Sequence, residues 1–382
     1  MSTAQQTTLP SDLHQATGHR LNRLRDTFSD AGIDAMLVGH EDDIRYLTGF
    51  CGHDTELLVT PDHTTIVCDN RYDTSLEPWR HADGFTVVMG TRHRLSDSVR
   101  ELAASAHIRR LGVQADRLTV IGFRSLATAL PDLQVVETTN LVTRLRQNKD
   151  DLEIAAIRHA IRVHHEALTA TMQAVEIGMT ERELYAVLDH EMKNRGATAP
   201  SFDAIIGVGA NSALPHHETG DTPITEGVLL IDAGASVNGY CSDITRTFGV
   251  GSMPDTIREI YQVVLDAQIA AIEYARPGVT CADTDKAARD VIEAAGYGKY
   301  FGHGLGHSMG INVHESPYFN HLETTTVLEP GMIMTFEPGI YIPGVGGVRI
   351  EDDVLITETG TDILSEWPKQ LDDMIITPAG SR

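Results

Sequence analysis

The feature that most constrains this chain is a strand, turn and strand pattern between residues 228 and 248. Residues 228–235 (Val-Leu-Leu-Ile-Asp-Ala-Gly-Ala) are an apolar stretch that one acid, Asp232, interrupts. The dipeptide Asn238-Gly239 follows, and it is the strongest short signal for a two-residue type I′ turn. Residues 240–248 return as a second strand that carries Asp243. The segment therefore predicts a β-hairpin with an acid on each arm.

The turn also sets the register of this hairpin. With the two turn residues in the loop, Asp232 lies opposite Thr245, and Asp243 lies opposite Gly234. Alternate residues of a strand share a face, so both aspartates point to the same side as diagonal neighbours. Two carboxylates at that separation repel each other unless one is protonated or a cation lies between them. The pair therefore predicts a divalent metal site, with surface acids on a hairpin as the alternative.

A second cluster combines histidines with glycines. His303, His307 and His314 follow one another at spacings of four and seven, and three glycines separate them. Glycine lets the backbone approach another group closely. A neutral imidazole is a ligand for zinc, cobalt, manganese or iron, and it also transfers protons near neutral pH. Three histidines in this setting favour a functional site over a purely structural role.

Two further acids stand in apolar β patterns near the end of the chain. Glu337 precedes a Pro-Gly turn signal, and Glu351 follows Arg349 by two residues, so those two share a strand face. Asp352 and Asp353 come next, and we interpret them as flanking acids that either support the site or are solvated.

Together the candidates form an oxygen-rich set with a single imidazole, which is typical of two divalent ions bridged by carboxylates. The set predicts metal-assisted hydrolysis, and the sequence has no nucleophile elbow, Walker loop or HExxH motif that would favour other chemistry. Its members are Asp232, Asp243, His307, Glu337 and Glu351.

Hydrophobic periodicity divides the chain into two regimes. After a flexible tail at residues 1–12, residues 13–148 alternate short strands and helices, as a small α/β domain does. Residues 149–382 are predicted to form an α+β domain, because amphipathic helices alternate with antiparallel strands. The expected helices are 151–175, 180–194, 255–275 and 282–295, and the expected strands are 228–234, 240–248, 332–342 and 348–356.

Composition excludes several classes of function. A length of 382 residues suits about two domains, and 30 basic against 54 acidic residues leave a net charge of −24. Such a chain repels nucleic acid and anionic lipid, so neither is an expected partner. The four cysteines are widely spaced, which argues against a disulfide scaffold or a cysteine-based zinc site. Without a long apolar run or a signal-like start, we expect a soluble cytoplasmic protein.

On these motifs, the sequence resembles the Xaa-Pro dipeptidase (prolidase) and aminopeptidase P branch of the pita-bread metallopeptidases, a family that includes methionine aminopeptidase. The resemblance implies a pita-bread catalytic domain at 149–382, preceded by a creatinase-like α/β N-terminal domain at 13–148. It also implies cleavage of the peptide bond before proline, in dipeptides or short peptides, by a metal-bridging hydroxide. The matching stretches are 46–50, 69–72, 201–217, 231–248, 302–317, 335–342 and 347–356.

Residue roles follow from the same resemblance. It implies two metal ions, manganese first with cobalt, zinc or iron as alternatives, bridged by Asp243 and Glu351. The remaining implied ligands are Asp232, His307 and Glu337. The catalytic residues would be His216, His303, His314 and Glu337, with the neighbouring His217 leaving the first assignment open. The substrate would contact His216, His303, Tyr341 and Arg349.

Other functions stay open on the same scaffold. A metal-using relative acting on a small non-peptide substrate, such as a creatine-like, ectoine-derived or sulfonium compound, is the alternative. A non-catalytic binding module is disfavoured because all five ligands are present. The resemblance further implies a homodimer with a small peptide as its substrate.

Overall fold

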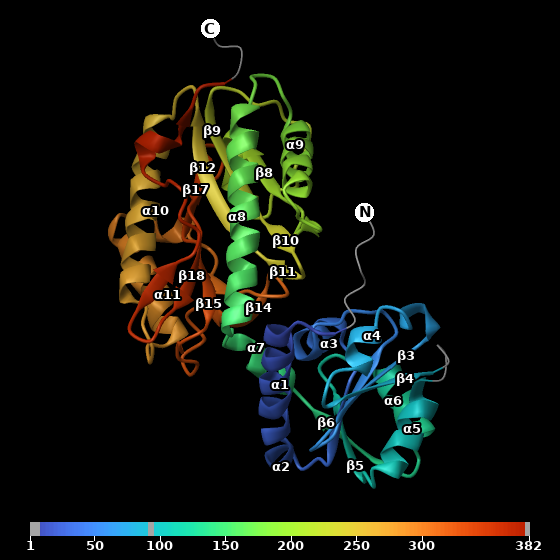
Figure 1. The fold of residues 1–382 in the computed structure, drawn as a ribbon. Helices are drawn as coiled ribbons and strands as arrows, with labels where there is room; N and C mark the ends of the chain where they lie inside the picture. The colour runs from blue at the N-terminus through green and yellow to red at the C-terminus, as the bar shows by residue number, and fades with distance from the viewer. Residues whose placement is uncertain (1–7, 91–94, 379–382) are drawn as a thin grey trace. The chain divides into compact units, whose positions relative to one another are not determined.

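The computed structural model describes residues 8–90 and 95–378. The chain forms two compact units, the first ending at Arg146 and the second beginning at Gln147 (Figure 1). Part of the expected tail, residues 1–7, lies outside the described residues. Its end was predicted wrongly, because Ser11 and Asp12 already belong to the first helix, α1.

The first unit is built on a six-stranded sheet with the order β4-β3-β2-β1-β5-β6. Strand β1 pairs antiparallel with β2 and parallel with β5, and β5 pairs parallel with β6. The strands are β1 (Ala35–Val38), β2 (Glu56–Val59), β3 (Thr64–Cys68), β4 (Phe85–Met89), β5 (Arg110–Gln114) and β6 (Gln134–Thr138). The helices are α1 (Ser11–Asp26), α2 (Phe28–Ala31), α3 (Glu41–Thr48), α4 (Glu77–Arg80), α5 (Leu95–Ser105), α6 (Val120–Ala129) and α7 (Leu141–Gln147).

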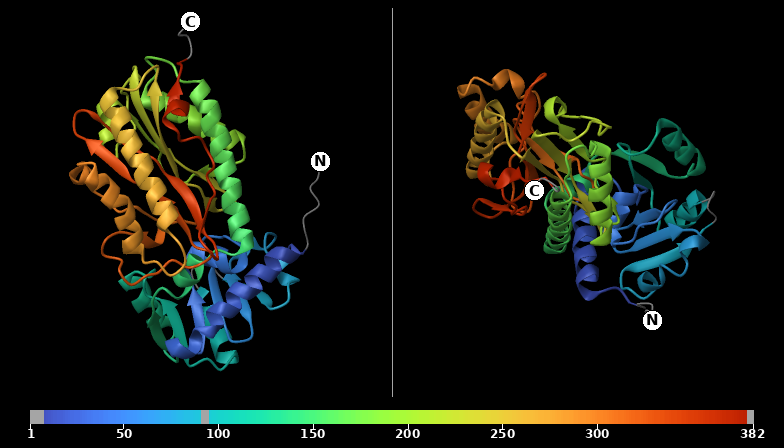
Figure 2. Two further views of the ribbon diagram at one scale, coloured as in Figure 1. Left: turned by 90° about the vertical axis from the view of Figure 1, so that its left-hand side faces the viewer. Right: turned by 90° about the horizontal axis from the view of Figure 1, so that it is seen from above.

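The second unit surrounds antiparallel strands with two pairs of long helices. Helix α8 (Asp151–Gln173) packs with α9 (Glu181–Asn194), and α10 (Asp255–Tyr274) packs with α11 (Cys281–Ala294) (Figure 2). Both α8 and α9 begin with a capping box, in which an N-cap side chain and a glutamate three residues later satisfy free backbone N–H groups.

Four small sheets carry the site, with the orders β11-β10-β7, β20-β12-β9-β8, β14-β13-β15-β18-β19 and β16-β17. Their strands are β7 (Ala199–Pro200), β8 (Ile205–Val208), β9 (Gly227–Ala233), β10 (Ala235–Val237), β11 (Tyr240–Cys241), β12 (Ile244–Val250), β13 (Gly306–Ser308), β14 (Glu315–Phe319), β15 (Ile333–Phe336), β16 (Gly339–Ile342), β17 (Gly346–Arg349), β18 (Asp352–Ile356), β19 (Thr361–Ile363) and β20 (Ile375–Ile376).

The predicted hairpin has the expected turn and part of the expected register. Asn238 and Gly239 have φ values of 53° and 82°, as a type I′ turn requires. Strands β9 and β12 pair antiparallel with Asp232 opposite Thr245, which confirms that part of the predicted register. The pairing of Asp243 with Gly234 does not occur within a strand ladder, because the backbone N–H of Asp243 donates to the Asp353 carboxylate instead.

Three strands predicted as continuous are each divided in the structure. Strands β11 and β12 replace 240–248, strands β15 and β16 replace 332–342, and strands β17 and β18 replace 348–356. Asp243, Glu337 and Glu351 lie in the three gaps. A residue that leaves the ladder is free to aim its side chain away from the alternating strand pattern, so each break redirects one of the predicted ligands.

Apolar side chains between the helix pairs and the sheets form the main core of the second unit. Leu229 and Ile231 of β9, Phe248 of β12 and Phe336 of β15 are all fully buried there. Within the described residues, no helix combines the length and the apolar character that a bilayer span needs.

Candidate active site

One cavity of the second unit collects the predicted ligands. It has a volume of about 420 Å³, and the strands that line it include β9, β13 and β17. Its wall contains all five expected metal ligands together with four other predicted site residues. The five are Asp232, Asp243, His307, Glu337 and Glu351, and the four are His216, His303, His314 and Arg349.

The centre of the cavity is a tight group of ligand atoms. Asp243, His307 and Glu351 each offer one donor atom, and these atoms lie within 4.8 Å of one another. The Nε2 atom of His307 lies 3.6 Å from Asp243 Oδ2 and 3.4 Å from Glu337 Oε1. Its Nδ1–H donates to the Ser308 carbonyl at 3.1 Å, so the lone pair of the neutral ring is on Nε2 and faces the carboxylates. That arrangement suits a cation between them.

Burial and mutual repulsion raise the proton affinity of these acids. Burial, and then the Glu351 and Asp232 charges, raise the pKa of Asp243 well above its usual range. Burial, and then the Glu337 and Asp232 charges, do the same for the pKa of Glu351. Burial is also the largest cause that raises the pKa of Glu337 to about 8. A positive charge placed among the carboxylates would relieve this repulsion.

Asp232 adds an unsatisfied oxygen to the group. Its Oδ2 accepts a hydrogen bond from Arg349 Nη2 at 2.5 Å. Its Oδ1 is buried and makes no hydrogen bond to any described residue. A buried acceptor without a donor is costly, and coordination to a cation removes that cost. Carboxylate oxygens with one imidazole nitrogen therefore fit divalent metal ions.

Comparison with known proteins identifies the two halves of the chain. Residues 155–358 match Metallopeptidase family M24, and residues 20–147 match the Creatinase/Prolidase N-terminal domain. The chain belongs to this metallopeptidase family. Membership implies divalent metal ions as cofactors, which the donor set above fits.

Individual relatives match this metallopeptidase over almost its whole length. It is 38% identical over 355 residues to the uncharacterized peptidase YqhT of Bacillus subtilis, with 92% of this chain and 99% of the relative covered. The solved Xaa-Pro dipeptidase from Bacillus anthracis superposes with a TM-score of 0.88 at 37% identity, covering 94% of this chain and all of that one. An X-Pro aminopeptidase from Thermotoga maritima gives a TM-score of 0.85 at 33% identity, covering 92% and 99% of the two chains. The expected creatinase-like and pita-bread fold is thereby confirmed.

Two glycines of the histidine cluster permit the close packing of β13. A Cβ atom on Gly306 would lie 2.1 Å from the Thr335 carbonyl oxygen, and one on Gly304 would lie 2.2 Å from the Phe319 carbonyl oxygen. No other residue type fits at those distances. The glycines therefore seat β13 against its neighbours and carry His307 into the cavity.

Arg349 ties the ligands to one another. Besides Asp232, its guanidinium donates from Nε to Thr245 Oγ1 at 3.0 Å and from Nη1 to the Tyr341 hydroxyl at 2.9 Å. The Thr245 hydroxyl in turn donates to Glu351 Oε2 at 2.6 Å. The buried cation thus positions two acids of the cavity, one directly and one through a threonine.

Tyr341 and His303 continue this chain of hydrogen bonds. His303 Nδ1–H donates to the Gly304 carbonyl at 2.7 Å, so its Nε2 accepts from the Tyr341 hydroxyl at 2.9 Å. Burial, and then the Arg349 charge, lower the pKa of His303 to about 4, so the ring is neutral at pH 7. Tyr341 itself is buried and is not among the residues that line the cavity. Its hydroxyl reaches the site through His303 and Arg349.

The structure separates the two adjacent histidines of the 201–217 stretch. His217 Nε2 lies 2.8 Å from Glu181 Oε2 on α9, while His216 is exposed and lines the cavity. Glu181 also accepts from the backbone N–H groups of Val208 and Gly220, both at 3.0 Å. The buried carboxylate of Glu181 therefore anchors the loop that presents His216.

Several site residues were missed in the sequence. Phe202, Asp203, Ile205, Tyr318 and Asn320 line the cavity. Phe202 and Asp203 belong to the same motif stretch as His216, so their proximity to it was the available signal. Thr245 carried a signal as well, since the hairpin register already placed it opposite Asp232.

The two flanking acids are not solvated. Asp353 is fully buried and accepts the backbone N–H of Asp243 at 3.2 Å. Asp352 is also fully buried and pairs with Arg246 at 2.7 Å. The solvated alternative was wrong because both acids lie on a strand, β18, that neighbouring elements cover on both faces. Their contacts support the backbone on which Asp243 and Glu351 lie.

Proposed function

We propose that this metallopeptidase hydrolyses the peptide bond before proline in dipeptides or short peptides. The observation that carries the proposal is the convergence of four acids and His307 in one cavity. The rest of its wall is partly apolar, with Phe202, Ile205 and Phe319 available to contact a prolyl ring. The Xaa-Pro dipeptidase of Bacillus anthracis and the X-Pro aminopeptidase of Thermotoga maritima, which match nearly the whole chain, support this substrate class.

The metal centre of the proposal uses the five sequence-predicted ligands. Asp232, Asp243, His307, Glu337 and Glu351 would hold two divalent ions, with manganese as the first candidate. When bound, such ions supply a Lewis acid and an activated water for attack on a carbonyl.

Three side chains are proposed to handle substrate and protons. Glu337 accepts the proton of the attacking water at its carboxylate, which Thr335 Oγ1 contacts at 3.2 Å, and returns it to the leaving prolyl nitrogen. His216 and His314 face the cavity, and neither ring is hydrogen-bonded to a described residue, so both are free to contact the peptide. Both nitrogens of His303 are already hydrogen-bonded, so it would contact the substrate through the face of its ring.

Substrate selectivity tests the proposal directly. Metal-stripped protein is reloaded separately with Mn²⁺, Co²⁺ or Zn²⁺ and offered Leu-Pro, Ala-Pro, a longer Xaa-Pro peptide and Leu-Ala. We expect metal-dependent cleavage of Xaa-Pro bonds and none of Leu-Ala. Cleavage confined to dipeptides indicates a dipeptidase, and cleavage of the longer peptide indicates an aminopeptidase. No cleavage by protein that binds two ions would contradict the proposal and favour a small non-peptide substrate.

Asp243→Asn tests the metal centre. The amide keeps the shape of the side chain but removes a charge from the ligand group, so we expect bound metal to fall and kcat to drop about 1000-fold or more. Elemental analysis and a Leu-Pro assay measure both quantities. Asp221→Asn, an exposed acid paired with Arg182, is the matched control and should change neither. Full metal content and activity in Asp243→Asn would refute the dinuclear arrangement.

The expected homodimer stays a prediction. Light scattering of the purified protein decides it, since a monomer and a dimer of a 41.7 kDa chain differ two-fold in mass.

A further inference from the structure

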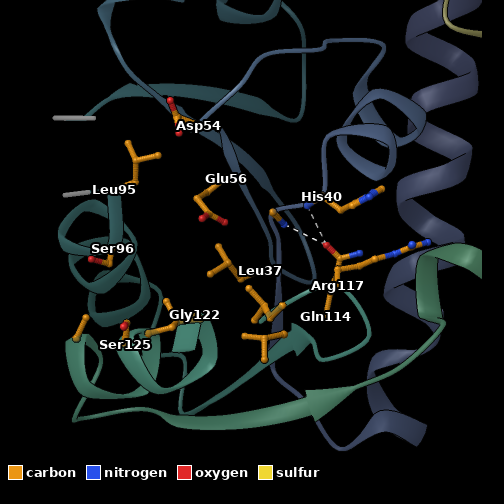
Figure 3. Close-up of a pocket in the computed structure, with 15 residues that line it drawn as sticks. Leu37, His40, Asp54, Glu56, Leu95, Ser96, Gln114, Arg117, Gly122 and Ser125 are labelled. Atoms are coloured by element: carbon orange, nitrogen blue, oxygen red, sulfur yellow. Dashed lines mark hydrogen bonds between the residues drawn. The ribbon is translucent and has the colours of Figure 1, made fainter. Parts of the chain in front are cut away.

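The N-terminal unit contains a cavity of its own, which the catalytic chemistry does not use. Its volume is about 450 Å³, and it lies between the ends of β1 and β5 and the helices α5 and α6 (Figure 3). Apolar side chains form much of its wall, and a few polar groups interrupt them. The apolar residues are Leu37, Leu95, Val113, Leu118, Leu126 and Ala129, and the polar ones include Glu56, Ser96, Gln114 and Ser125.

The cavity occupies the place where open α/β sheets bind ligands. From β1 the chain builds β2, β3 and β4 on one side of the sheet, and then returns to place β5 and β6 on the other side. Strands β1 and β5 are parallel, so their carboxyl ends meet at one edge, and residues from both ends line the cavity. A crevice at such a reversal of strand order is the usual ligand position in this class of sheet.

Hydrogen bonds hold one side of this cavity in place. The backbone N–H groups of Gly39 and His40 both donate to Gln114 Oε1, at 3.1 and 3.2 Å (Figure 3). Gln114 Nε2 donates to Asp43 Oδ2 at 2.6 Å, and Asp43 pairs with Arg146 at 2.7 Å. A connected polar network therefore forms this side of the cavity wall. Both lone pairs of Gln114 Oε1 are used within it.

Glu56 lies outside this hydrogen-bonded network. Its carboxylate points into the cavity among the lining side chains in Figure 3, and no hydrogen bond or ion pair joins it to another described residue. Burial raises the pKa of Glu56 to about 7. Gly39 makes this placement feasible, since a Cβ at that position would lie 2.9 Å from Glu56 Oε2.

The basic side chains that line the described part of the cavity face acids other than Glu56. Arg117 Nε lies 3.9 Å from Asp43 Oδ2 and 3.8 Å from Asp116 Oδ2. His40 Nδ1 lies 3.6 Å from Asp43 Oδ2. Asp54, the other acid of the described wall, pairs with Arg71 Nη2 at 2.8 Å. The described residues of the wall therefore supply the half-buried Glu56 with no counterion, and a carboxylate withdrawn from water without a partner is costly to keep.

We propose that this cavity is a binding site for a small organic cation, an ammonium group on a short apolar body. The ammonium would pair with the Glu56 carboxylate, and the hydroxyl groups of Ser96 and Ser125 would offer further acceptors. Leu37, Val113 and Leu126 would contact the apolar body. A free amine and the amino terminus of a peptide share this chemistry.

Calorimetric titration of the full-length, metal-loaded protein tests the site with three probes. These are 2-phenylethylamine for a free amine, phenylalaninamide for a peptide amino terminus, and the neutral 2-phenylethanol. We expect at least one amine to bind and the alcohol to bind at least about ten-fold more weakly, because it lacks the charge. Which amine binds more tightly identifies the source of the cation.

Variants locate the binding. Glu56→Gln keeps the shape of the side chain and should weaken amine binding at least about ten-fold. Glu137→Gln, an exposed glutamate on β6, is the matched control and should bind like the wild type. Ser125→Phe fills the cavity from α6 and should abolish binding without removing the charge. Cleavage of Leu-Pro checks that each variant is folded, and amines that enter the acidic catalytic cavity would bind all the variants alike.

The pH dependence separates a cation from a neutral ligand. Because Glu56 must be ionised to pair with an ammonium, affinity for 2-phenylethylamine, an alkylamine that stays protonated in this range, should rise by up to about ten-fold between pH 6 and pH 8. Among the described residues, the other charged or titratable groups of the wall are His40, Arg117 and Asp54, and the Glu56→Gln variant retains them all. The rise should therefore disappear in that variant. Equal amine binding by wild type and Glu56→Gln, or no binding of any probe at millimolar concentration, would overturn the proposal.

Discussion

Single hydroxyl groups connect the charged side chains of the catalytic cavity. Thr245 accepts from Arg349 and donates to Glu351, while Tyr341 accepts from Arg349 and donates to His303. Each hydroxyl uses both of its hydrogen-bonding capacities, so it orients one acid or imidazole relative to a cation. Buried networks of this kind hold geometry only when every member is satisfied.

Tyr341→Phe removes one such hydroxyl without changing the shape of the ring. His303 then loses the donor to its Nε2, so we expect kcat/KM to fall about ten-fold, which corresponds to about 1.4 kcal/mol. Bound metal should stay unchanged, because Tyr341 contacts no ligand atom directly. Tyr297→Phe is the control, since its hydroxyl binds Glu259 on the surface. Loss of metal from Tyr341→Phe would show that the hydroxyl supports the metal centre instead.

His164 predicts an acid-sensitive fold. It is fully buried on α8, neither ring nitrogen has a hydrogen-bond partner among the described residues, and burial lowers its pKa to about 3. The unfolded chain therefore binds a proton that the folded chain excludes. This stabilising contribution is complete above pH 6.5 and is lost as the pH falls towards 3, by about 2 kcal/mol between pH 6.5 and pH 5.

His164→Leu should remove that loss and raise the free energy of unfolding at pH 5 relative to the wild type. Urea unfolding at pH 7 and pH 5 measures the difference, with His159→Leu, a partly exposed position of the same helix, as control. If the two leucine variants show the same pH dependence as the wild type, another group causes the acid sensitivity.

Elements position the ligands by ending or breaking at them. The strand breaks at Asp243, Glu337 and Glu351 direct these three carboxylates into the same cavity. Asp232 and His307, in contrast, lie within β9 and β13. Loops act in the same way: the segment after β8 presents His216 only because α9 anchors it. A functional side chain here depends on backbone support that lies on another element.

The first turn of α9 offers a matched pair of glutamates that tests this dependence. Glu181→Gln places its amide NH2 against one of two backbone donors, Val208 N–H or Gly220 N–H, so we expect a loss of about 2 kcal/mol and a several-fold higher KM as His216 shifts. Glu183→Gln affects only the exposed capping box at Thr180, and should cost less than about 1 kcal/mol with KM unchanged. Equal effects of the two variants on KM would mean that Glu181 does not hold the loop.

At the scale of the whole molecule, the two units carry separate chemistry. The acids that need a cation lie in the second unit, while the first unit has its own core and its own cavity. A ligand stabilises only the part of a protein that it binds. Metal removal should therefore act on one unit.

Calorimetry with and without a chelator tests this expectation. At about 100 times the dissociation constant, bound metal adds about 2.7 kcal/mol, which shifts the melting of a domain of this size by about 5–10 °C. We expect EDTA to lower the transition of the second unit by that amount and to leave the first unit unchanged. The Asp243→Asn variant should show no response to EDTA. A shift of both transitions, or of neither, would contradict the assignment.

The sequence by itself determined the features that depend on neighbours along the chain. The Asn238-Gly239 turn imposes positive φ at two positions, and that local constraint was enough to place Asp232 opposite Thr245. The capping residues of α8 and α9 could be predicted in the same way, because a capping box involves residues only three positions apart. The five ligands were recognisable because acids within apolar strands are costly without a partner.

Only the tertiary structure decided which groups meet across long distances in the chain. It separated His216 from His217 through Glu181, buried Asp352 and Asp353, and placed Glu56 in a second cavity where no described residue pairs with it. Periodicity shows which face of an element is apolar, but not which distant element covers that face. The element that packs over a residue determines whether it is buried and which charges lie near it. The burial and the partners of these residues therefore depend on the tertiary structure.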